Sequence, residues 1–181
     1  RGLGIQYFGH PIIDQIKQDK LNTNLRSVDA FSLNTIALFP GSREQEGGRH
    51  LPVLLDFIKK YSIINPNINF ILSCAPNINS NFFNNIQSKN VKLDDRPLPL
   101  ICCDADLAIV ASGTATLECA MYNVPMVVIY KMSLLSWLIT KYFIKIKFAS
   151  IVNILCGRFL VSEVLQSQLI VANLIYEINN L

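Results

Sequence analysis

The stretch Ile36-Ala37-Leu38-Phe39-Pro40-Gly41-Ser42-Arg43 joins four apolar residues to a turn that ends in a hydroxyl and a guanidinium. The apolar run predicts a buried strand that ends at Pro40-Gly41. Residues 51–61 then predict a helix that ends near Asn65-Pro66, because apolar residues recur there at the spacing of one helix face. A buried strand followed closely by a helix is typical of a parallel sheet.

Three further apolar runs alternate with helical stretches along the chain. They predict strands over residues 69–73, 106–110 and 126–130, with a short helix over residues 114–122. An Asn-rich stretch, residues 77–90, predicts a polar helix with loops. The alternation predicts an α/β fold, a Rossmann-like parallel sheet with helices on both faces. The tail, residues 160–181, predicts one or two helices broken near Ser167.

The length of 181 residues suits a single domain with one sizeable core. Hydrophobic residues make up 51% of the chain and charged residues only 16%, so an apolar surface is either deeply buried or in contact with a membrane. No run reaches the roughly 20 apolar residues of a membrane-spanning helix, and no export signal opens the chain. The net charge of +3 is too small to indicate nucleic-acid binding, but it is compatible with an acidic lipid surface.

One segment in the second half has a different character. Residues 133–148 predict a helix that is apolar on most faces, with Trp137, Tyr142 and Phe143 interleaved with lysines. Burial between domains or between the subunits of a homodimer is one interpretation. Contact with a lipid surface is the other.

The five cysteines are scattered, with no Cys-x-x-Cys pair and no histidine at zinc-site spacing. They are interpreted as buried small hydrophobic residues in a reducing compartment. We expect no metal and no cofactor, because Asp104 and Asp106 lead into a buried strand and Asp94-Asp95 is expected to be a solvated loop. The two histidines, His10 and His50, have no nearby acid and are expected to be structural or solvent-exposed.

Two turns carry the candidate chemistry. In the first, Gly41, Ser42 and Arg43 follow the predicted strand and precede a helix, which is where parallel sheets bind ligands. Backbone N–H groups at a helix start favour an anion, and an arginine binds phosphate oxygens in a bidentate way. An ordinary turn with a surface arginine is the alternative.

The second turn is Ser112-Gly113-Thr114, at the end of the third predicted strand. The two hydroxyls are expected to cap the following helix, and Glu118 lies one turn along from Thr114. A phosphate at this helix start would leave Glu118 within reach of vicinal hydroxyls such as those of a ribose. A capped structural helix with a solvated Glu118 is the alternative. If the two strands are adjacent, both turns point to one crevice.

These turns belong to an ordered series that closely resembles the carboxy-terminal half of the lipid-A-disaccharide synthase family. The series opens at Phe8-Gly9-His10-Pro11 and continues through Gly41-Ser42-Arg43-x-x-Glu46 and residues 111–118, 125–132, 150–158 and 163–166. Gly47 and Gly48 depart from the family pattern, and glycine costs about 1 kcal/mol per helix position relative to alanine. We therefore expect a frayed helix start after Arg43.

The resemblance implies a GT-B glycosyltransferase, in which two Rossmann-like domains face each other across a cleft. The family is cytoplasmic and peripheral at the inner membrane of Gram-negative bacteria. It transfers 2,3-diacylglucosamine from UDP-2,3-diacylglucosamine to 2,3-diacylglucosamine 1-phosphate, the lipid X-type acceptor, in lipid A biosynthesis, and it releases UDP. This chain would be the UDP-sugar side of the cleft.

The resemblance also implies the residues of a donor site. Ser42 and Arg43 would meet the diphosphate, the second turn would cradle it, and Glu118 would hold the ribose. The implied set is Gly41, Ser42, Arg43, Ser112, Gly113, Thr114, Glu118, Asn153 and Arg158.

By the same resemblance, residues 1–35 are an inter-domain entry segment and residues 36–159 a Rossmann-like nucleotide-sugar-binding domain. Residues 160–181 are then incomplete C-terminal helices. The amino-terminal acceptor domain, with the expected catalytic base, would be absent, so the isolated fragment is expected to be inactive. Two alternatives stay open: another GT-B enzyme acting on UDP-GlcNAc, such as a peptidoglycan-type transferase or a 2-epimerase, or a non-catalytic truncated copy.

Overall fold

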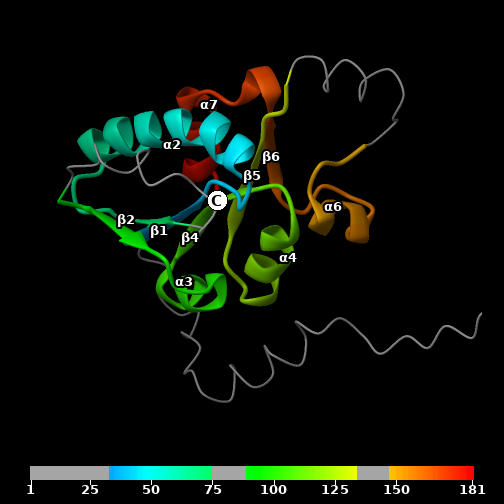
Figure 1. Cartoon of the computed structure of the whole chain (residues 1–181), viewed down its shortest axis with the longest axis horizontal. Helices are drawn as coiled ribbons and strands as arrows, with labels where there is room; N and C mark the ends of the chain where they lie inside the picture. The colour runs from blue at the N-terminus through cyan, green and yellow to red at the C-terminus, as the bar shows by residue number, and fades with distance from the viewer. Residues whose placement is uncertain (1–32, 75–88, 134–146) are drawn as a thin grey trace, which may run out of the picture. The chain divides into compact units, whose positions relative to one another are not determined.

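A computed structural model of the chain describes residues 33–74, 89–133 and 147–181. The described residues form one six-stranded parallel sheet in the order β3-β2-β1-β4-β5-β6 (Figure 1). The strands are β1 (Thr35–Phe39), β2 (Asn69–Ser73), β3 (Val91–Asp94), β4 (Leu107–Ala111), β5 (Met126–Tyr130) and β6 (Ser162–Leu165). The chain moves outward from β1 in one direction and then, from β4, in the other. This reversal between β1 and β4 is the topological switch point of a Rossmann-like sheet.

Helices cover both faces of this sheet, as the sequence predicts. The described helices are α2 (Glu44–Ile64), α3 (Leu98–Asp104), α4 (Thr114–Met121), α6 (Ile151–Cys156), the 3-10 turn η2 (Gln166–Gln168) and α7 (Val171–Asn179). Helices α2 and α7 pack together on one face, while α3 and α4 lie on the other (Figure 1). Apolar residues of α2 and α7 form one core with the inner strands. The α/β fold class is therefore confirmed.

The four inner strands lie where the apolar runs predict them. Strands β2 and β5 match the predicted ranges, and β1 and β4 differ by one residue. Almost every residue in these strands is buried, which is the pattern of a parallel sheet covered on both faces. The helix predicted over residues 114–122 corresponds to α4.

The two edge strands are not predicted. In β3, two of the four residues are charged, and two of the four are exposed. In β6, the run Ser-Glu-Val-Leu is short and half polar. The expectation of helices throughout residues 160–181 is therefore wrong for Ser162–Leu165, which extend the sheet beside β5, and only α7 and the turn before it are helical.

The expected fraying after Arg43 is also wrong. Helix α2 begins at Glu44 and runs through both Gly47 and Gly48. Its first turn is closed by the Arg43 carbonyl, which accepts from the amides of Glu46 and Gly47 at 3.0 and 2.9 Å. Two glutamates in this turn also favour the helix, because negative charge is stabilised at a helix amino terminus. The helices predicted over residues 77–90 and 133–148 lie almost wholly outside the described residues, as does most of the 1–35 entry segment.

Candidate functional site

The turn after β1 has a backbone that suits glycine. Gly41 has a φ of +109°, in the left-handed region that other residues rarely adopt. A Cβ at this position would also lie 3.0 Å from Glu46 Oε2 and 3.5 Å from the Cβ of Ala111. Gly41 thus lets the turn pass close to the start of α2 and to the end of β4.

Arg43 leaves this turn toward solvent. Its side chain is 80% exposed, and Nη1 donates to Glu46 Oε1 at 2.9 Å. Ser42 is exposed as well. An exposed ion pair of this kind contributes little to folding stability, so the guanidinium is available to exchange its partner for an anionic ligand.

The turn after β4 is held by bonds that differ from the predicted caps. Gly113 is the N-cap of α4, and no side chain caps this helix. The Ser112 hydroxyl instead donates to the Ala149 carbonyl at 2.6 Å, and the Thr116 hydroxyl donates to the Gly113 carbonyl at 2.7 Å. The capping prediction for Ser112 and Thr114 is therefore wrong: Ser112 ties the turn to a distant segment, and Thr114 stays exposed.

The two turns leave adjacent strands at the switch point. Phe39 and Val110 are register partners at the ends of β1 and β4, so the turns begin side by side. Each turn leads directly into a helix, α2 or α4, whose first amides have no partner inside the helix. The predicted position of the two turns at one edge of the sheet is thus observed, at the place where parallel sheets bind ligands.

A cavity of about 550 Å³ opens beside the first turn. Its walls are residues 43–46 and Arg49 from α2 on one side and residues 130–133 after β5 on the other. Arg43, Arg49 and Lys131 bring positive charge to it, while Glu44 and Glu46 bring negative charge. The cavity therefore offers both donors and acceptors next to the candidate anion site.

His50 is fully buried and contacts Lys131, one of the residues that line this cavity. Its Nδ1 lies 2.8 Å from the Pro40 carbonyl, and its Nε2 accepts from the Lys131 amide at 3.0 Å. The structural interpretation of His50 is thus supported, whereas His10 lies outside the described residues. Sequence reasoning missed the contact with Lys131, because the two residues are 81 positions apart.

Asn153 and Arg158 occupy contrasting positions. Asn153 is fully buried, and its amide nitrogen donates to Glu163 and to the Val161 carbonyl. Its amide oxygen accepts from the amides of Leu160 and Val161 at 2.7 and 3.0 Å. These four bonds use the hydrogen-bonding capacity of the side chain, so Asn153 holds the chain between α6 and β6 in place. Arg158 is exposed on that connection.

Glu163 extends this network to the second turn. Its carboxylate accepts from the amides of Ala149 and Ser150 at 2.8 and 2.9 Å as well as from Asn153. Because the Ala149 carbonyl in turn accepts from Ser112, the network connects the start of β6 to the turn after β4. Glu118 is half-buried on α4, one turn from Thr114, and its contact with a ribose stays a prediction.

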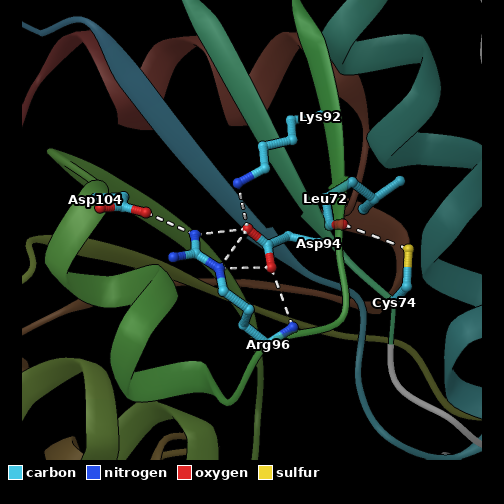
Figure 2. Close-up of polar contacts among 6 residues, drawn as sticks. All are labelled: Leu72, Cys74, Lys92, Asp94, Arg96 and Asp104. Carbon is cyan, nitrogen blue, oxygen red and sulfur yellow. Dashed lines mark hydrogen bonds and ion pairs between the residues drawn. The ribbon is translucent and has the colours of Figure 1, made fainter.

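A second charged cluster lies at the end of β3, shown in Figure 2. Arg96 donates to both oxygens of Asp94 at 2.7–3.0 Å and to Asp104 at 2.6 Å, and Lys92 lies 2.9 Å from Asp94. The Asp94 side chain is only 2% exposed, and the Arg96 contacts hold the pKa of its carboxyl well below its usual range. The expectation of a solvated loop at Asp94-Asp95 is therefore wrong for Asp94.

The remaining predictions concern metal, cysteines and membrane spans. Within residues 33–74, 89–133 and 147–181, no three His, Cys, Asp or Glu side chains are grouped as a metal site would need, and no helix has the length and apolarity to cross a bilayer. All five cysteines are free thiols; Cys102 and Cys119 are buried, whereas Cys156 is exposed and so contradicts the expectation of general burial. The hydrogen bond with the neighbouring Cys119 thiol, together with burial, raises the pKa of Cys102.

Comparison with known proteins gives one consistent result. A family model described as lipid-A-disaccharide synthetase matches residues 1–179. Lipid-A-disaccharide synthase 1 of Legionella pneumophila is 36% identical over 171 residues, which cover 91% of this chain and 44% of that protein. The lipid-A-disaccharide synthase of Myxococcus xanthus is 32% identical over 173 residues, with coverage of 93% and 45%.

The chain thus spans less than half the length of these relatives. Among solved structures, the glycosyltransferase SnogD from Streptomyces nogalater aligns with 56% of this chain and 26% of its own, at 20% identity and a TM-score of 0.41. The family match rests on the sequence comparisons, which cover nearly the whole chain. By these matches the chain belongs to the lipid-A-disaccharide synthase family.

Proposed function

We propose that this chain binds the UDP moiety of an acylated UDP-sugar as the donor half of a GT-B glycosyltransferase. The observation that carries the proposal is the pair of turns after β1 and β4, which meet at the switch point in a chain of this family. Gly41, Ser42 and Arg43 approach the diphosphate from one side in this proposal. Ser112, Gly113 and Thr114 approach it from the other.

The chemistry of such a site is stabilisation of a leaving group. When a UDP-sugar loses its sugar, negative charge develops on the diphosphate, and donors fixed in advance lower the energy of that state. The amides at the starts of α2 and α4 supply such donors without a change in protonation. Arg43 adds a full positive charge, and Glu118 would accept hydrogen bonds from the ribose hydroxyls.

For the complete enzyme, we propose the reaction that the family resemblance implies. The donor would be UDP-2,3-diacylglucosamine, the acceptor 2,3-diacylglucosamine 1-phosphate, and the second product UDP. The acceptor site and the catalytic base would lie in the part of the family's length that this chain does not span. Arg158, exposed after α6, would face the donor only in that complete enzyme.

Calorimetric titration with UDP tests the donor site. Arg43→Ala and Glu118→Ala should each weaken binding by about 1–3 kcal/mol, the usual loss for a hydrogen bond to a charged group. Lys60→Ala is a matched control, because Lys60 is an exposed cation near the opposite end of α2. Binding that is equal in all four proteins would remove the site assignment.

The same titration with a chelator tests the proposed independence from metal. Affinity should not change, because Arg43 and the helix starts provide the positive potential. Loss of UDP binding on addition of the chelator would contradict this part of the proposal.

A peripheral membrane location is the second part of the proposal, and an apolar surface around α6 supports it. Ile154, Leu155, Phe159 and Leu160 are all exposed, with Leu155 at 69% and Phe159 at 67%. Arg158 lies among them, and the sequence holds no Asp or Glu between Glu118 and Glu163. An apolar surface in a segment with only positive charges suits an anionic lipid surface.

Co-sedimentation with anionic vesicles tests this surface. Leu155→Glu should reduce the bound fraction, whereas Ile63→Glu, at an apolar position on α2 that is slightly more exposed, should not. Light scattering on the same samples distinguishes binding to vesicles from formation of a homodimer. A homodimer contact is the alternative interpretation of the apolar 133–148 segment. Equal sedimentation of both variants would exclude the α6 surface as the membrane contact.

A further inference from the structure

We propose that His50 is a positioning residue for the donor site, fixing the turn after β1 and the chain after β5 relative to each other. The inference rests on the proposed UDP binding, because it assigns to His50 the support of that site. It also explains why a polar ring is fully buried in α2, in contact with a residue that lines the cavity.

The two walls of the cavity follow strands that do not pair, β1 and β5. Strand β4 lies between β1 and β5, so no ladder of backbone hydrogen bonds joins the ends of the outer two. The His50 ring crosses this gap, from the Pro40 carbonyl at 2.8 Å to the Lys131 amide at 3.0 Å. Pro40 immediately precedes the Gly41 turn, and Lys131 lines the cavity.

The two contacts require one particular state of the ring. The Lys131 amide is a donor, so Nε2 must accept, and the proton of the neutral ring is therefore on Nδ1, where it donates to the Pro40 carbonyl. A protonated ring would carry a hydrogen on both nitrogens. It would then present a donor to the Lys131 amide, and that contact would be lost.

The surroundings of His50 favour the neutral ring. Burial is the largest effect and lowers the pKa of His50 below its ordinary 6.5, and the charges of Arg49 and Lys131 act in the same direction. The Pro40 carbonyl and Glu46 oppose this. Tyr130 is the further titratable group at the ring, with its ring centroid 6.3 Å away.

Three substitutions of His50 test its contacts with Pro40 and Lys131, separately and together. His50→Asn places an amide near the Nδ1 position and keeps a donor for Pro40, whereas His50→Gln reaches the Nε2 position and keeps an acceptor for Lys131. His50→Phe removes both contacts and keeps a ring of similar size. Each variant of the 181-residue chain is titrated with UDP, and its melting temperature is measured in parallel.

The His50→Phe variant should bind UDP about tenfold more weakly, equivalent to the loss of one or two hydrogen bonds that hold the site. His50→Asn and His50→Gln should fall between this variant and the wild type. As the pH falls below 6.5, wild-type affinity should fall more steeply than that of His50→Asn, because only the wild type carries an imidazole at position 50 that can gain a proton. Protonation of UDP itself affects both proteins equally.

The outcomes separate the two proposals. A wild-type chain that does not bind UDP overturns the proposed function and this inference with it. Wild-type binding that all three variants retain, at any melting temperature, overturns the positioning role alone, because His50 would then only stabilise the fold. If His50→Phe does not fold, the Asn and Gln variants and the pH profile decide the question.

Discussion

Arg43 and Arg96 both follow the carboxyl end of a strand in the same sheet, yet their surroundings differ. Arg96 contacts Asp94 through both carboxylate oxygens and also reaches Asp104. Arg43 is 80% exposed, and among the described residues its ion pair is with Glu46. The fold uses the charge of Arg96 to close the β3–α3 connection, whereas it leaves the charge of Arg43 at the edge of a cavity.

The difference shows that an arginine at a strand end is not by itself a sign of a binding site. At β3 two carboxylates, one of them buried, are paired with two cations, Arg96 and Lys92, so the charges of the cluster balance within the protein. At β1 a left-handed glycine, a helix start and an exposed guanidinium occur together beside a second turn of the same kind. The combination, not the arginine, is what supports the proposed anion site.

The largest effect is expected at the structural cluster. Asp94→Ala should lower the free energy of unfolding by about 2–4 kcal/mol, because it removes a buried carboxylate and leaves Arg96 and Lys92 without their main partner. Chemical denaturation measures this loss. Asp95→Ala, at the exposed neighbouring position, is the control and should change stability by less than about 0.5 kcal/mol. A similar loss of stability in both variants would show that Asp94 contributes no more to the fold than its exposed neighbour.

The sequence predicts the strands that are buried and apolar. It fails to predict the strands whose residues are polar or charged. Strands β1, β2, β4 and β5 are apolar runs inside the sheet, so their pattern is clear. In strand β3, charged residues that belong to the ion-pair cluster alternate with apolar residues, and β6 is a short, half-polar strand at the edge of the sheet. Helix α3 was not predicted either, because two prolines at its start and a length of seven residues conceal it.

For the candidate site, the sequence predicts the two turns but not the contacts that hold them. Turn chemistry is local, so glycine, hydroxyl and arginine in a row after a strand are visible in the sequence. The His50–Lys131 and Ser112–Ala149 contacts join residues 81 and 37 positions apart, and no local pattern encodes them. Asn153 illustrates the same limit, because family resemblance implies a donor contact, whereas the fold occupies its amide with four hydrogen bonds.

Gly41→Ala should have the next largest effect on stability, and it tests the turn after β1. The added Cβ would meet Glu46 Oε2 at 3.0 Å and would force alanine into a φ of +109°. We expect a loss of about 1–3 kcal/mol in unfolding free energy, typical of a strained backbone residue, together with weaker UDP binding. Gly157→Ala, at a positive φ with open space around it, is the control for backbone strain alone.

UDP affinity should separate these two glycine variants. Gly41→Ala disturbs the contact between the turn and Glu46, whereas Gly157 lies after α6, away from the turn. Unchanged UDP binding in Gly41→Ala would contradict a role for this turn in the donor site.

The stability of the fold in acid should depend on His50 and on Asp94 in two different pH ranges. His50 and Asp94 both have a lowered pKa in the folded chain, from ordinary values of 6.5 and 3.8. The folded state then binds fewer protons than the unfolded state, so each group's contribution is complete above its ordinary value and is lost as the pH falls below it. Denaturation midpoints should therefore decline first below pH 6.5 and again below pH 3.8.

Variants of the two residues show which group causes each decline in stability. His50→Asn should remove the first decline and keep the second, while Asp94→Asn should do the reverse. A first decline that persists in His50→Asn would show that another group titrates in that window, and the neutral-ring interpretation of His50 would fail.

The smallest expected effect is the stability change in Arg43→Ala. Its ion pair with Glu46 is exposed on the arginine side, and exposed pairs at this helical spacing contribute at most about 0.5 kcal/mol. Chemical denaturation of the variant should therefore match the wild type within that margin, even though its UDP binding is weakened. A larger loss would mean that the fold depends on Arg43 as it does on Asp94. The exposed guanidinium would then be a structural group, and the distinction between the two arginines would no longer identify the binding site.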